Sequence, residues 1–419
     1  MRRGSRVWLL LPAAGAALAL LTSCGAPPAG APAPAQQHSS AQQASAVIAP
    51  HITITPADNS QAVPLDTPVV VSTTAGILSV TAQEAGAPAP TGTLSRDGRT
   101  WTLAGGLDSQ ATYTIVATAA NSAGHVTSQA TFTTLAAQDR LITSVQPYDG
   151  QTVGVGEPIT LKFNTDIPDN LKAAALQRIS IVSTPAVVGA WHWYSDSVVH
   201  FRTQNYWPAG THVTITGNMK GFDAGNGVWG LGDWTSSFTV GAKHVSIIDD
   251  TTHMMQVYNG DQLIATYPVS MGKPGFTTLS GTLIVLYKSY VVKMQSCGTF
   301  GGAACIPGTA NYYDENVYYD TAISTNGFFI HAAPWSVYAQ GHYDVSHGCV
   351  NLSTQNAISF FNFSVPGDVV VIQHTSNPAD YTNGEADWQT PFAQFPNTPG
   401  DSNDVWTNPA ALPPGYRAG

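Results

Sequence analysis

The sequence predicts a mainly β protein in which two similar sandwich modules precede a third, mostly β domain with one short helix. Three observations lead to this prediction. Short segments of alternating apolar and polar residues run from residue 48 to residue 241, the layout of the first half of that stretch recurs in the second half, and the pattern changes near residue 242. Alternation with a period of two, broken by Gly, Pro, Asn and Asp, indicates half-buried strands joined by turns.

The N-terminus carries a targeting signal. Three arginines precede an apolar run that ends at Leu21, and Cys24 follows shortly after it. The run is shorter than the roughly 20 residues of a membrane-spanning helix, so residues 1–23 are interpreted as a cleaved signal peptide. Small residues before the cysteine suit a lipoprotein signal peptidase. We therefore expect a lipid anchor on Cys24 and a location outside the cytoplasmic membrane, in the cell wall or periplasmic space. The alternative is an ordinary signal peptide in which the cysteine occurs by chance.

Composition excludes one class of partner. The chain has 16 Lys and Arg against 26 Asp and Glu, a formal net charge of −10, and such a surface repels nucleic-acid phosphates. Residues 24–47 are Ala, Pro, Gln and Ser without hydrophobic periodicity. They predict a disordered linker that tethers the folded part to the membrane.

Residues 48–136 and 137–241 are the two predicted sandwiches. The turn Pro56-Ala57-Asp58-Asn59 recurs as Pro147-Tyr148-Asp149-Gly150, and each copy ends in a strand rich in Thr and Ser. Short strands at this spacing predict two tandem immunoglobulin-like modules. Neither module contains a cysteine or a cluster of acids and bases. We therefore expect the modules to be spacers.

Three histidines of the second module need an interpretation. His192, His200 and His212 have no Cys, Asp or Glu at ligand spacing. We therefore expect them to be surface residues or satisfied core residues, not metal ligands.

The third domain is expected at residues 242–375. Asn259-Gly260 predicts a tight hairpin, a strand is predicted from Gly281 to Lys288, and a helix is predicted over Ser353 to Phe363 with Ser353 as its N-cap. Residues 376–419 form a C-terminal extension. Its aromatic residues predict packing against the folded part, and we expect poor order beyond about Asp401. These aromatics are Trp388, Phe392 and Phe395.

The chemistry is expected where a cysteine and two histidines meet. His331 follows an apolar strand, and Ser346-His347-Gly348-Cys349 comes after fourteen further residues. A thiol with a pKa near 8.5 becomes an effective nucleophile when an adjacent imidazole takes its proton. Gly348 allows the backbone to bring amide N–H groups towards a developing oxyanion. The pattern predicts nucleophilic acyl transfer by Cys349.

Counting cysteines supports a free Cys349. Cys297 and Cys305 lie close together in a Gly-rich loop and make the more natural disulfide pair, which leaves Cys349 over. One alternative is that Cys349 is a structural disulfide partner. Another is a zinc site, although His347 and Cys349 lie only two residues apart and no second Cys or His pair completes a ligand shell.

These residues closely resemble the L,D-transpeptidase catalytic domain, also called YkuD. Its signature is a His followed at a distance by Ser/Thr-His-Gly-Cys and an Asn two places on. The segment Met271-Gly272-Lys273-Pro274 and the residues after His331 are similar to those of mycobacterial and related actinobacterial lipoprotein members. Such proteins consist of a lipobox, immunoglobulin-like modules, the catalytic domain and a C-terminal segment. The resemblance implies the same architecture here.

The resemblance also implies roles for individual residues. Cys349 is similar to the nucleophile that forms a thioester and displaces the terminal D-alanine, and His331 to the general base. Close relatives usually have Ser at the position of Ala332, and we expect little loss because the backbone carbonyl orients the imidazole there. The other implied site residues are His347 and Ser346, which shape the pocket, Asn351, which helps to bind the donor peptide, and Tyr313, which lies by the oxyanion together with the amides of Gly348 and Cys349.

The implied reaction joins two peptidoglycan stem peptides by a 3→3 cross-link, from a tetrapeptide donor to the side-chain amine of an acceptor. No metal or organic cofactor is expected, and carbapenems are expected to acylate Cys349. A disulfide between Cys297 and Cys305 would stiffen the flap that covers the substrate. The alternatives are an L,D-carboxypeptidase, in which water accepts the acyl group, and a catalytically silent wall-binding lipoprotein.

Overall fold

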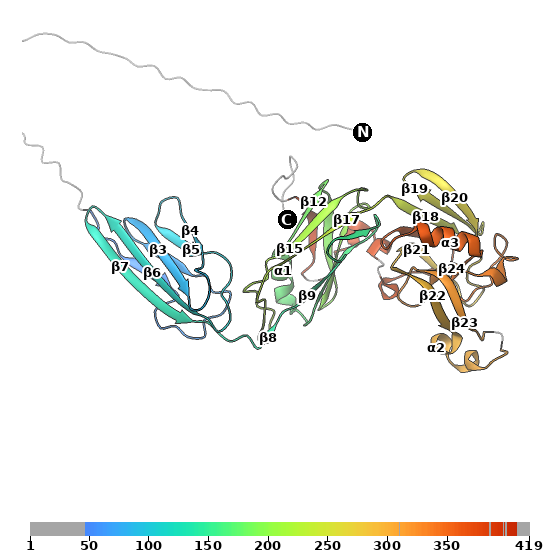
Figure 1. The fold of residues 1–419 in the computed structure, drawn as a ribbon, viewed down its shortest axis with the longest axis horizontal. Helices are drawn as coiled ribbons and strands as arrows, with labels where there is room; N and C mark the ends of the chain where they lie inside the picture. The colour runs from blue at the N-terminus through green and yellow to red at the C-terminus, as the bar shows by residue number, and fades with distance from the viewer. Residues whose placement is uncertain (1–46, 310, 385–386, 397, 399, 409–419) are drawn as a thin grey trace, which may run out of the picture. The chain divides into compact units, whose positions relative to one another are not determined.

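The structure is a computed structural model that describes residues 47–408, apart from 310, 385–386, 397 and 399 (Figure 1). The expected signal peptide, the lipidated Cys24 and the tether lie outside the described residues. The described residues from Ile48 onward belong to one compact unit. Within this described part, no helix combines the length and the apolar character that crossing a membrane requires.

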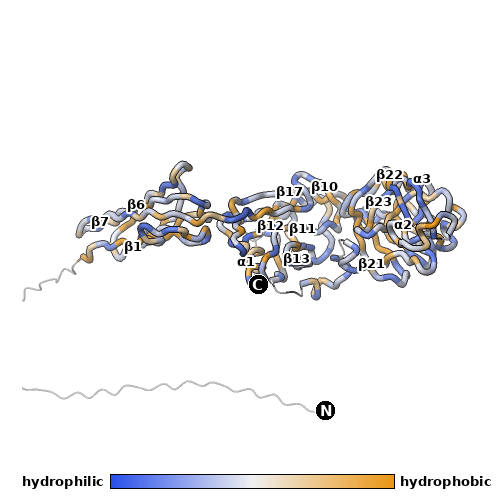
Figure 2. Tube along the Cα trace, turned by 90° about the horizontal axis from the view of Figure 1, so that it is seen from below, coloured by the Kyte–Doolittle hydropathy of each residue, from blue (hydrophilic) through white to orange (hydrophobic). Residues whose placement is uncertain are grey.

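The first module is a sandwich of two antiparallel sheets. In strand β6 (Thr112–Asn121) every second residue from Tyr113 to Ala119 is buried, as expected of a strand with one face on a core. Tyr113 stacks on Phe132 with ring centroids 5.4 Å apart. Figure 2 shows the alternation of apolar and polar stretches along the chain. One sheet has the order β1 (Ile52–Thr55), β2 (Val70–Thr73), β5 (Thr100–Leu103), β4 (Gly92–Leu94), and the other β3 (Ile77–Glu84), β6, β7 (Gly124–Thr133).

The second module is a larger sandwich with its own core. Trp191, Phe201 and Trp207 lie buried at its centre, and Phe201 is within 5.3 Å and 6.1 Å of the other two rings, centroid to centroid. Helix α1 (Asp169–Gln177) is an insertion that the first module lacks. One sheet of the second module has the order β10 (Gln151–Val153), β17 (Trp234–Val240), β15 (His212–Gly217), β12 (Ile179–Thr184). The other has the order β28 (Ser402–Trp406), β13 (Val188–Ser195), β14 (Val198–Thr203), β11 (Ile159–Phe163), β9 (Thr143–Gln146). The strands β8 (Asp139–Arg140) and β16 (Val228–Trp229) form a separate small pair.

The C-terminal extension packs on the second module. The Arg202 guanidinium lies over the rings of Trp388, Phe392 and Phe395, at 4.8, 5.5 and 4.8 Å, which confirms that these aromatics are packed. Strand β28 then pairs with β13. The expectation of poor order beyond Asp401 is therefore wrong for residues 402–408, because the module offers β28 the free edge of a sheet.

The extension also explains two of the histidines. His192 Nδ1 lies 2.8 Å from Asp401 Oδ2, and His200 Nδ1 lies 3.1 Å from Asp387 Oδ1. His212 is exposed and lies 3.1 Å from Thr239 Oγ1. They are satisfied or surface residues, as expected.

The third domain is built from two sheets around one core. Strands β19 (Met254–Asn259) and β20 (Gln262–Pro268) form the predicted hairpin at Asn259-Gly260. Helix α3 (Thr354–Phe363) is also confirmed, with Ser353 Oγ accepting from Asn356 N. The sheets are β20, β19, β18 (His244–Asp249), β26 (Val369–Gln373), β21 (Leu279–Ile284), β27 (Asn377–Pro378), and β22 (Tyr287–Gln295), β23 (Asp314–Ala322), β24 (Phe329–Ala332), β25 (Val350–Leu352).

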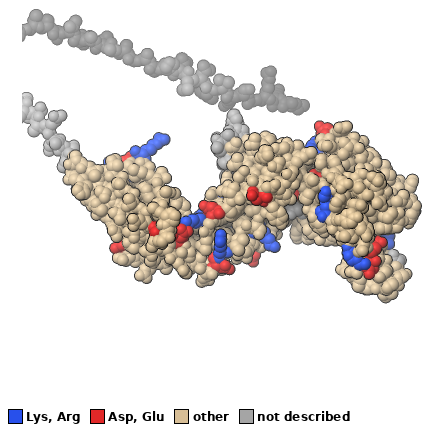
Figure 3. Space-filling view, viewed as in Figure 1, with Lys and Arg blue, Asp and Glu red and all other residues tan. Residues whose placement is uncertain are grey.

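The single strand predicted from Gly281 to Lys288 is wrong. Strand β21 ends at Ile284, and β22 begins at Tyr287 in the other sheet. The apolar run continues through the crossing because Val285 is buried between the two strands. Figure 3 shows that charged side chains are sparse on the visible face, in agreement with the 10% of charged residues.

Candidate active site

Two neighbouring parallel strands bring the predicted residues together. Strand β24 pairs with β25, and His331 lies opposite Asn351. Cys349 comes just before β25, two positions before the residue opposite His331. Adjacent strands are about 4.8 Å apart, so the fold places the thiol and the imidazole at one site although eighteen positions separate them in the sequence.

His331 is held as a neutral base. Its Nδ1 lies 3.0 Å from the carbonyl oxygen of Ala332. Because a carbonyl can only accept, Nδ1 carries the hydrogen and Nε2 keeps its lone pair. The side chain is buried, and this burial lowers its pKa to about 4, against the opposing effect of the Ala332 carbonyl. The orienting contact comes from the backbone, so Ala in place of Ser leaves it intact.

Cys349 is the free cysteine of the described residues. Its sulfur forms a weak hydrogen bond to the carbonyl oxygen of Gly327 at 3.7 Å. Burial raises the pKa of the thiol to about 12, an N–H of Phe329 opposes this shift, and the charge of Asp320 adds to it. The resting site therefore holds a neutral thiol beside a neutral imidazole, and the proton must move during the attack.

A bulge in β23 lies opposite the histidine. Tyr318 pairs with Ala332 and Thr321 with Ile330, so Tyr319 and Asp320 both lie opposite His331. Tyr319 has a φ of 56°, which an extra residue in a strand allows. Asp320 is fully buried, and burial raises its pKa to about 7. Sequence reasoning missed this bulge, because a strand with alternating residues shows no sign of it.

The Ser-His-Gly-Cys turn is stabilised by its serine. Ser346 Oγ donates to the carbonyl oxygen of Cys349 at 2.7 Å and accepts from Gly348 N at 3.0 Å. The Gly348 amide is thus engaged in this structure. That the Gly348 amide donates to the oxyanion stays a prediction. It requires that the hydrogen bond from Gly348 N to Ser346 Oγ break when the substrate binds.

Gly348 is required by the turn. Its φ is 126°, and a Cβ at this position would lie 2.9 Å from Cε1 of Phe328. We expect Gly348→Ala to lower stability by about 1–3 kcal/mol and activity by at least about tenfold, because the turn must shift. Urea unfolding and initial rates measure the two effects. Gly260→Ala is the matched control, with positive φ but open space around its Cβ, and equal activity losses in both variants would contradict the explanation.

His347 lies in an aromatic group beside the turn. Its ring centroid is 4.8 Å from that of Phe276 and 5.0 Å from that of Tyr313. Lys273 Nζ donates to His347 Nε2 at 3.1 Å. Burial, together with this ammonium, lowers the pKa of His347 to about 4, so His347 is a neutral acceptor here. Lys273 entered the sequence argument only as part of a resemblance, and its contact with His347 could not be foreseen from its position.

The two remaining predicted site residues occupy different surroundings. Tyr313 is half-buried, and burial raises the pKa of its hydroxyl, while the Thr299 side chain opposes the shift and the charge of Cys349 adds to it. Its ring centroid lies 5.0 Å from that of His347 in the turn. Asn351 is buried, and its amide donates to Ser336 Oγ at 3.0 Å. This bond ties β25 to the segment after the catalytic histidine. Binding of the donor by the Asn351 side chain stays a prediction.

A cavity of about 430 Å³ opens beside the turn. Its walls are apolar or uncharged, and they include Phe276, Phe300, Phe328, His347, Ser376 and Asn377. A larger cavity of about 510 Å³ lies between β13 and the C-terminal extension, and neither Cys349 nor His331 lines it. Neither residue lines the smaller cavity either, but His347 of the Ser-His-Gly-Cys turn does, so the smaller cavity is the one that lies next to the catalytic turn.

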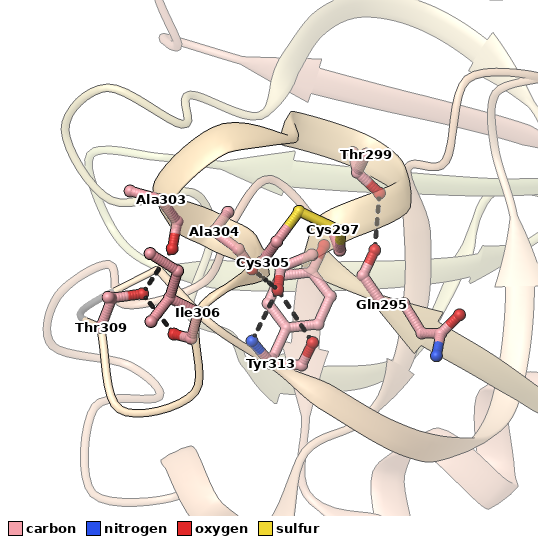
Figure 4. Close-up of a disulfide and its surroundings, with 10 residues drawn as sticks. Gln295, Cys297, Thr299, Ala303, Ala304, Cys305, Ile306, Thr309 and Tyr313 are labelled. Atoms are coloured by element: carbon pink, nitrogen blue, oxygen red, sulfur yellow. Dashed lines mark hydrogen bonds between the residues drawn. A yellow bond between two sulfur atoms is a disulfide. The ribbon is translucent and has the colours of Figure 1, made fainter.

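The segment from Ser296 to Tyr313, which is the predicted flap and is called the lid below, lies next to this cavity and contains a disulfide. Cys297 in α2 (Ser296–Phe300) is bonded to Cys305 at the end of η1 (Gly302–Cys305), and Figure 4 shows Tyr313 beside the bridge. Ser296 Oγ donates to the carbonyl oxygen of Ala304 and accepts from Tyr313 N. The lid and Tyr313 are thus fixed to each other.

Removing the bridge is expected to loosen the lid. In the double variant Cys297→Ser/Cys305→Ser, the loop is no longer closed by a covalent bond, so its open states gain conformational entropy. The free energy of local opening should fall by about 2–3 kcal/mol. We expect faster hydrogen exchange over residues 296–313 and unchanged exchange in β6. A non-reduced digest should contain the Cys297–Cys305 peptide, and its absence or unchanged exchange in the lid would contradict this picture.

One group of side chains has the spacing of metal ligands. Asp250, His253 and Asp344 offer ligand atoms within 4.8 Å of one another, the one such group in the described part of the chain. It includes neither Cys349 nor His331. The zinc site considered from the sequence would have used the catalytic residues.

Comparison with known proteins finds family models that match two parts of the chain. The bacterial Ig domain model matches residues 60–223, and the L,D-transpeptidase catalytic domain model matches residues 243–372. L,D-transpeptidase 2 of Mycobacterium tuberculosis (strain CDC 1551 / Oshkosh) is 34% identical over 352 residues, 83% of this chain and 85% of that protein. L,D-transpeptidase 5 of Mycobacterium tuberculosis (strain ATCC 25618 / H37Rv) is 31% identical over 376 residues, 87% of this chain and 78% of that protein.

Solved structures are also similar. The structure of LD transpeptidase LdtMt1 in complex with imipenem is 28% identical, covers 56% of this chain and 99% of that chain, and has a TM-score of 0.48. The range that the catalytic-domain model matches, residues 243–372, spans Cys349, His331 and the turn described above. The chain therefore belongs to the L,D-transpeptidase family, as an enzyme in which an immunoglobulin-like region precedes the catalytic domain.

Proposed function

We propose that this L,D-transpeptidase uses a tetrapeptide stem of peptidoglycan as its acyl donor and forms a 3→3 cross-link through a thioester on Cys349. The arrangement that supports this most strongly is a free cysteine just before β25 and a buried histidine on the adjacent strand β24, where burial raises the pKa of the thiol and lowers that of the imidazole, so that both are neutral. In such a pair the thiol can pass its proton to the imidazole as the sulfur attacks, and the imidazolium can then give a proton to the leaving group.

In the first half-reaction the Cys349 sulfur attacks the carbonyl carbon of the donor's third residue, and the thiol proton passes to His331 Nε2. The C–S bond forms, the C–N bond to the terminal D-alanine breaks, and the imidazolium gives its proton to the leaving amine. The Tyr313 hydroxyl, kept protonated by its raised pKa, and nearby backbone amides would stabilise the oxyanion.

In the second half-reaction the side-chain amine of another stem's third residue attacks the thioester. A new C–N bond forms, the C–S bond breaks, and the amine proton returns to sulfur through His331. One amide is exchanged for another, and one D-alanine is released per cross-link. The Cys349 thiol should also open the β-lactam ring of a carbapenem and keep the inhibitor bound as a thioester.

The test follows the fate of a purified disaccharide-tetrapeptide. We expect a dimer that has lost one D-alanine. A matched donor with an acetylated third-residue amine cannot serve as acceptor, so it should yield no dimer. Tripeptide monomer as the only product from the free-amine donor would identify a carboxypeptidase, and no release of D-alanine would refute enzymatic activity on this substrate.

We also propose that the protein is anchored outside the cytoplasmic membrane by a lipid on Cys24, with peptidoglycan within its reach. Support comes from the lipobox at the end of the apolar run. Metabolic labelling with a palmitate analogue should mark the wild type and not Cys24→Ala. Equal labelling of both proteins would contradict the anchor.

A further inference from the structure

The cations of the catalytic domain are few, and most are occupied. Residues 242–375 contain four lysines and no arginine. Three of these lysines have other close partners in the described structure. The partners are Asp261 for Lys243, Asp314 for Lys293, and the carbonyl oxygens of Phe361 and Ser364 for Lys288.

Lys273 differs from Lys243 and Lys293 because its contacts are all with uncharged groups, and from Lys288 because its hydrogen bonds are longer than the two of 2.6 Å that Lys288 donates to carbonyl oxygens. Its ammonium lies 3.1 Å from His347 Nε2, 3.3 Å from Asn311 Oδ1 and 5.2 Å from the centroid of the Phe276 ring. No carboxylate among the described residues forms an ion pair with it. A half-buried ammonium with neutral partners retains its full charge for an incoming anion.

The backbone fixes Lys273 beside the catalytic turn. Lys273 N donates to the carbonyl oxygen of Ser346 at 3.0 Å, and Gly272 forms a parallel bridge with Ser346. Two of the groups that Lys273 touches, Phe276 and His347, line the cavity of about 430 Å³, and none of the lining residues is acidic. The ammonium is thus placed at the wall of an uncharged cavity, next to the residues that precede Cys349.

On the basis of the proposed function, we propose that Lys273 binds the terminal carboxylate of the donor stem and so selects donors that end at the residue after the scissile bond. In a tetrapeptide donor the carboxylate is only two bonds from the nitrogen that leaves. A donor seated for attack by Cys349 therefore carries one negative charge close to the turn. In a longer stem, or in an amidated one, that charge is absent at this place.

The test compares two donors that differ only in the charge of this group. The purified full-length enzyme is given the disaccharide-tetrapeptide with a free terminal carboxylate or with a terminal carboxamide. A charge-assisted hydrogen bond corresponds to about 10- to 100-fold in kcat/KM, so we expect the wild type to prefer the acid by that factor. Lys273→Met should lose this factor on the acid and turn over both donors at similar rates, and Lys273→Arg should keep the preference.

Control variants and donors separate this role from others. Lys243→Met, an exposed lysine paired with Asp261, should behave as the wild type. If Lys273 only positions His347, Lys273→Met will slow both donors equally and the preference will survive, which overturns the inference. The inference is also overturned if the enzyme discriminates between donors by amidation of the carboxylate on the second stem residue, and not by amidation of the terminal carboxylate.

Folding and function failures remain distinguishable from failure of the inference. If Lys273→Met melts at a much lower temperature, the ratio of wild-type kcat/KM values on the two donors still tests the inference. Equal wild-type rates on the acid and the carboxamide refute carboxylate recognition without any variant. A wild type that turns over neither donor contradicts the proposed function itself, and the inference about Lys273 fails with it.

Discussion

Cys349→Ala is expected to abolish acyl transfer, with a loss of at least about 10³-fold in the release of D-alanine from the tetrapeptide donor. The sulfur forms the covalent bond in both proposed half-reactions, and no other free thiol exists among the described residues. Without it, the His331 base has no nucleophile to activate. The measurement is D-alanine release and dimer formation by liquid chromatography with mass detection.

The fold of this variant should persist. The hydrogen bond from the Cys349 thiol to the carbonyl oxygen of Gly327 is weak, at 3.7 Å, so the free energy of unfolding should change by less than about 1 kcal/mol. Incubation with a carbapenem gives a second measurement: the mass of the wild type should increase by one inhibitor, and that of Cys349→Ala should not. Undiminished turnover or an unchanged adduct in the variant would remove Cys349 from the mechanism.

Local signals explain which parts of this fold could be predicted. Asn259-Gly260 fixes a hairpin and Ser353 caps α3 because each effect acts within four residues of the chain. The chemistry of the turn is similarly local, since a free cysteine next to a histidine and a glycine indicates a nucleophile. The comparison with known relatives agrees with the fold class and the enzyme class inferred in this way.

Contacts between distant segments could not be predicted. The partners of His192 and His200 are Asp401 and Asp387, about 190 to 210 positions later, and no period or spacing links them. The same is true of β28, which joins the sheet of a module completed long before it in the chain. Side-chain orientation is equally inaccessible, since a motif match cannot show that Gly348 N donates to Ser346.

His331→Gln is expected to lower kcat/KM by about 10²- to 10⁴-fold while leaving the nucleophile in place. Glutamine can still donate to the Ala332 carbonyl, so the variant removes mainly the basic Nε2. The wild-type pH profile should identify the same group. Because burial lowers the pKa of His331 to about 4, activity should be level from about pH 5 to pH 8 and fall only as the pH approaches 4.

Stability should depend on pH through the same residue. The pKa of His331 is lower in the folded chain than the ordinary value of 6.5, so between pH 6.5 and 4 the unfolded chain binds a proton that the folded chain does not. His331 therefore contributes its full stability above pH 6.5, and that contribution is lost as the pH falls towards 4. The loss approaches about 3 kcal/mol for a shift of this size.

Urea unfolding at pH 7.5 and pH 4.5, in the wild type and in His331→Gln, isolates this effect. Other groups, including His347 with its own lowered pKa, titrate in both proteins and cancel in the difference between them. The wild type should lose more stability than the variant on acidification. An inflection of wild-type kcat/KM near pH 6.5, together with equal acid sensitivity of the two proteins, would show that folding does not lower the pKa of His331.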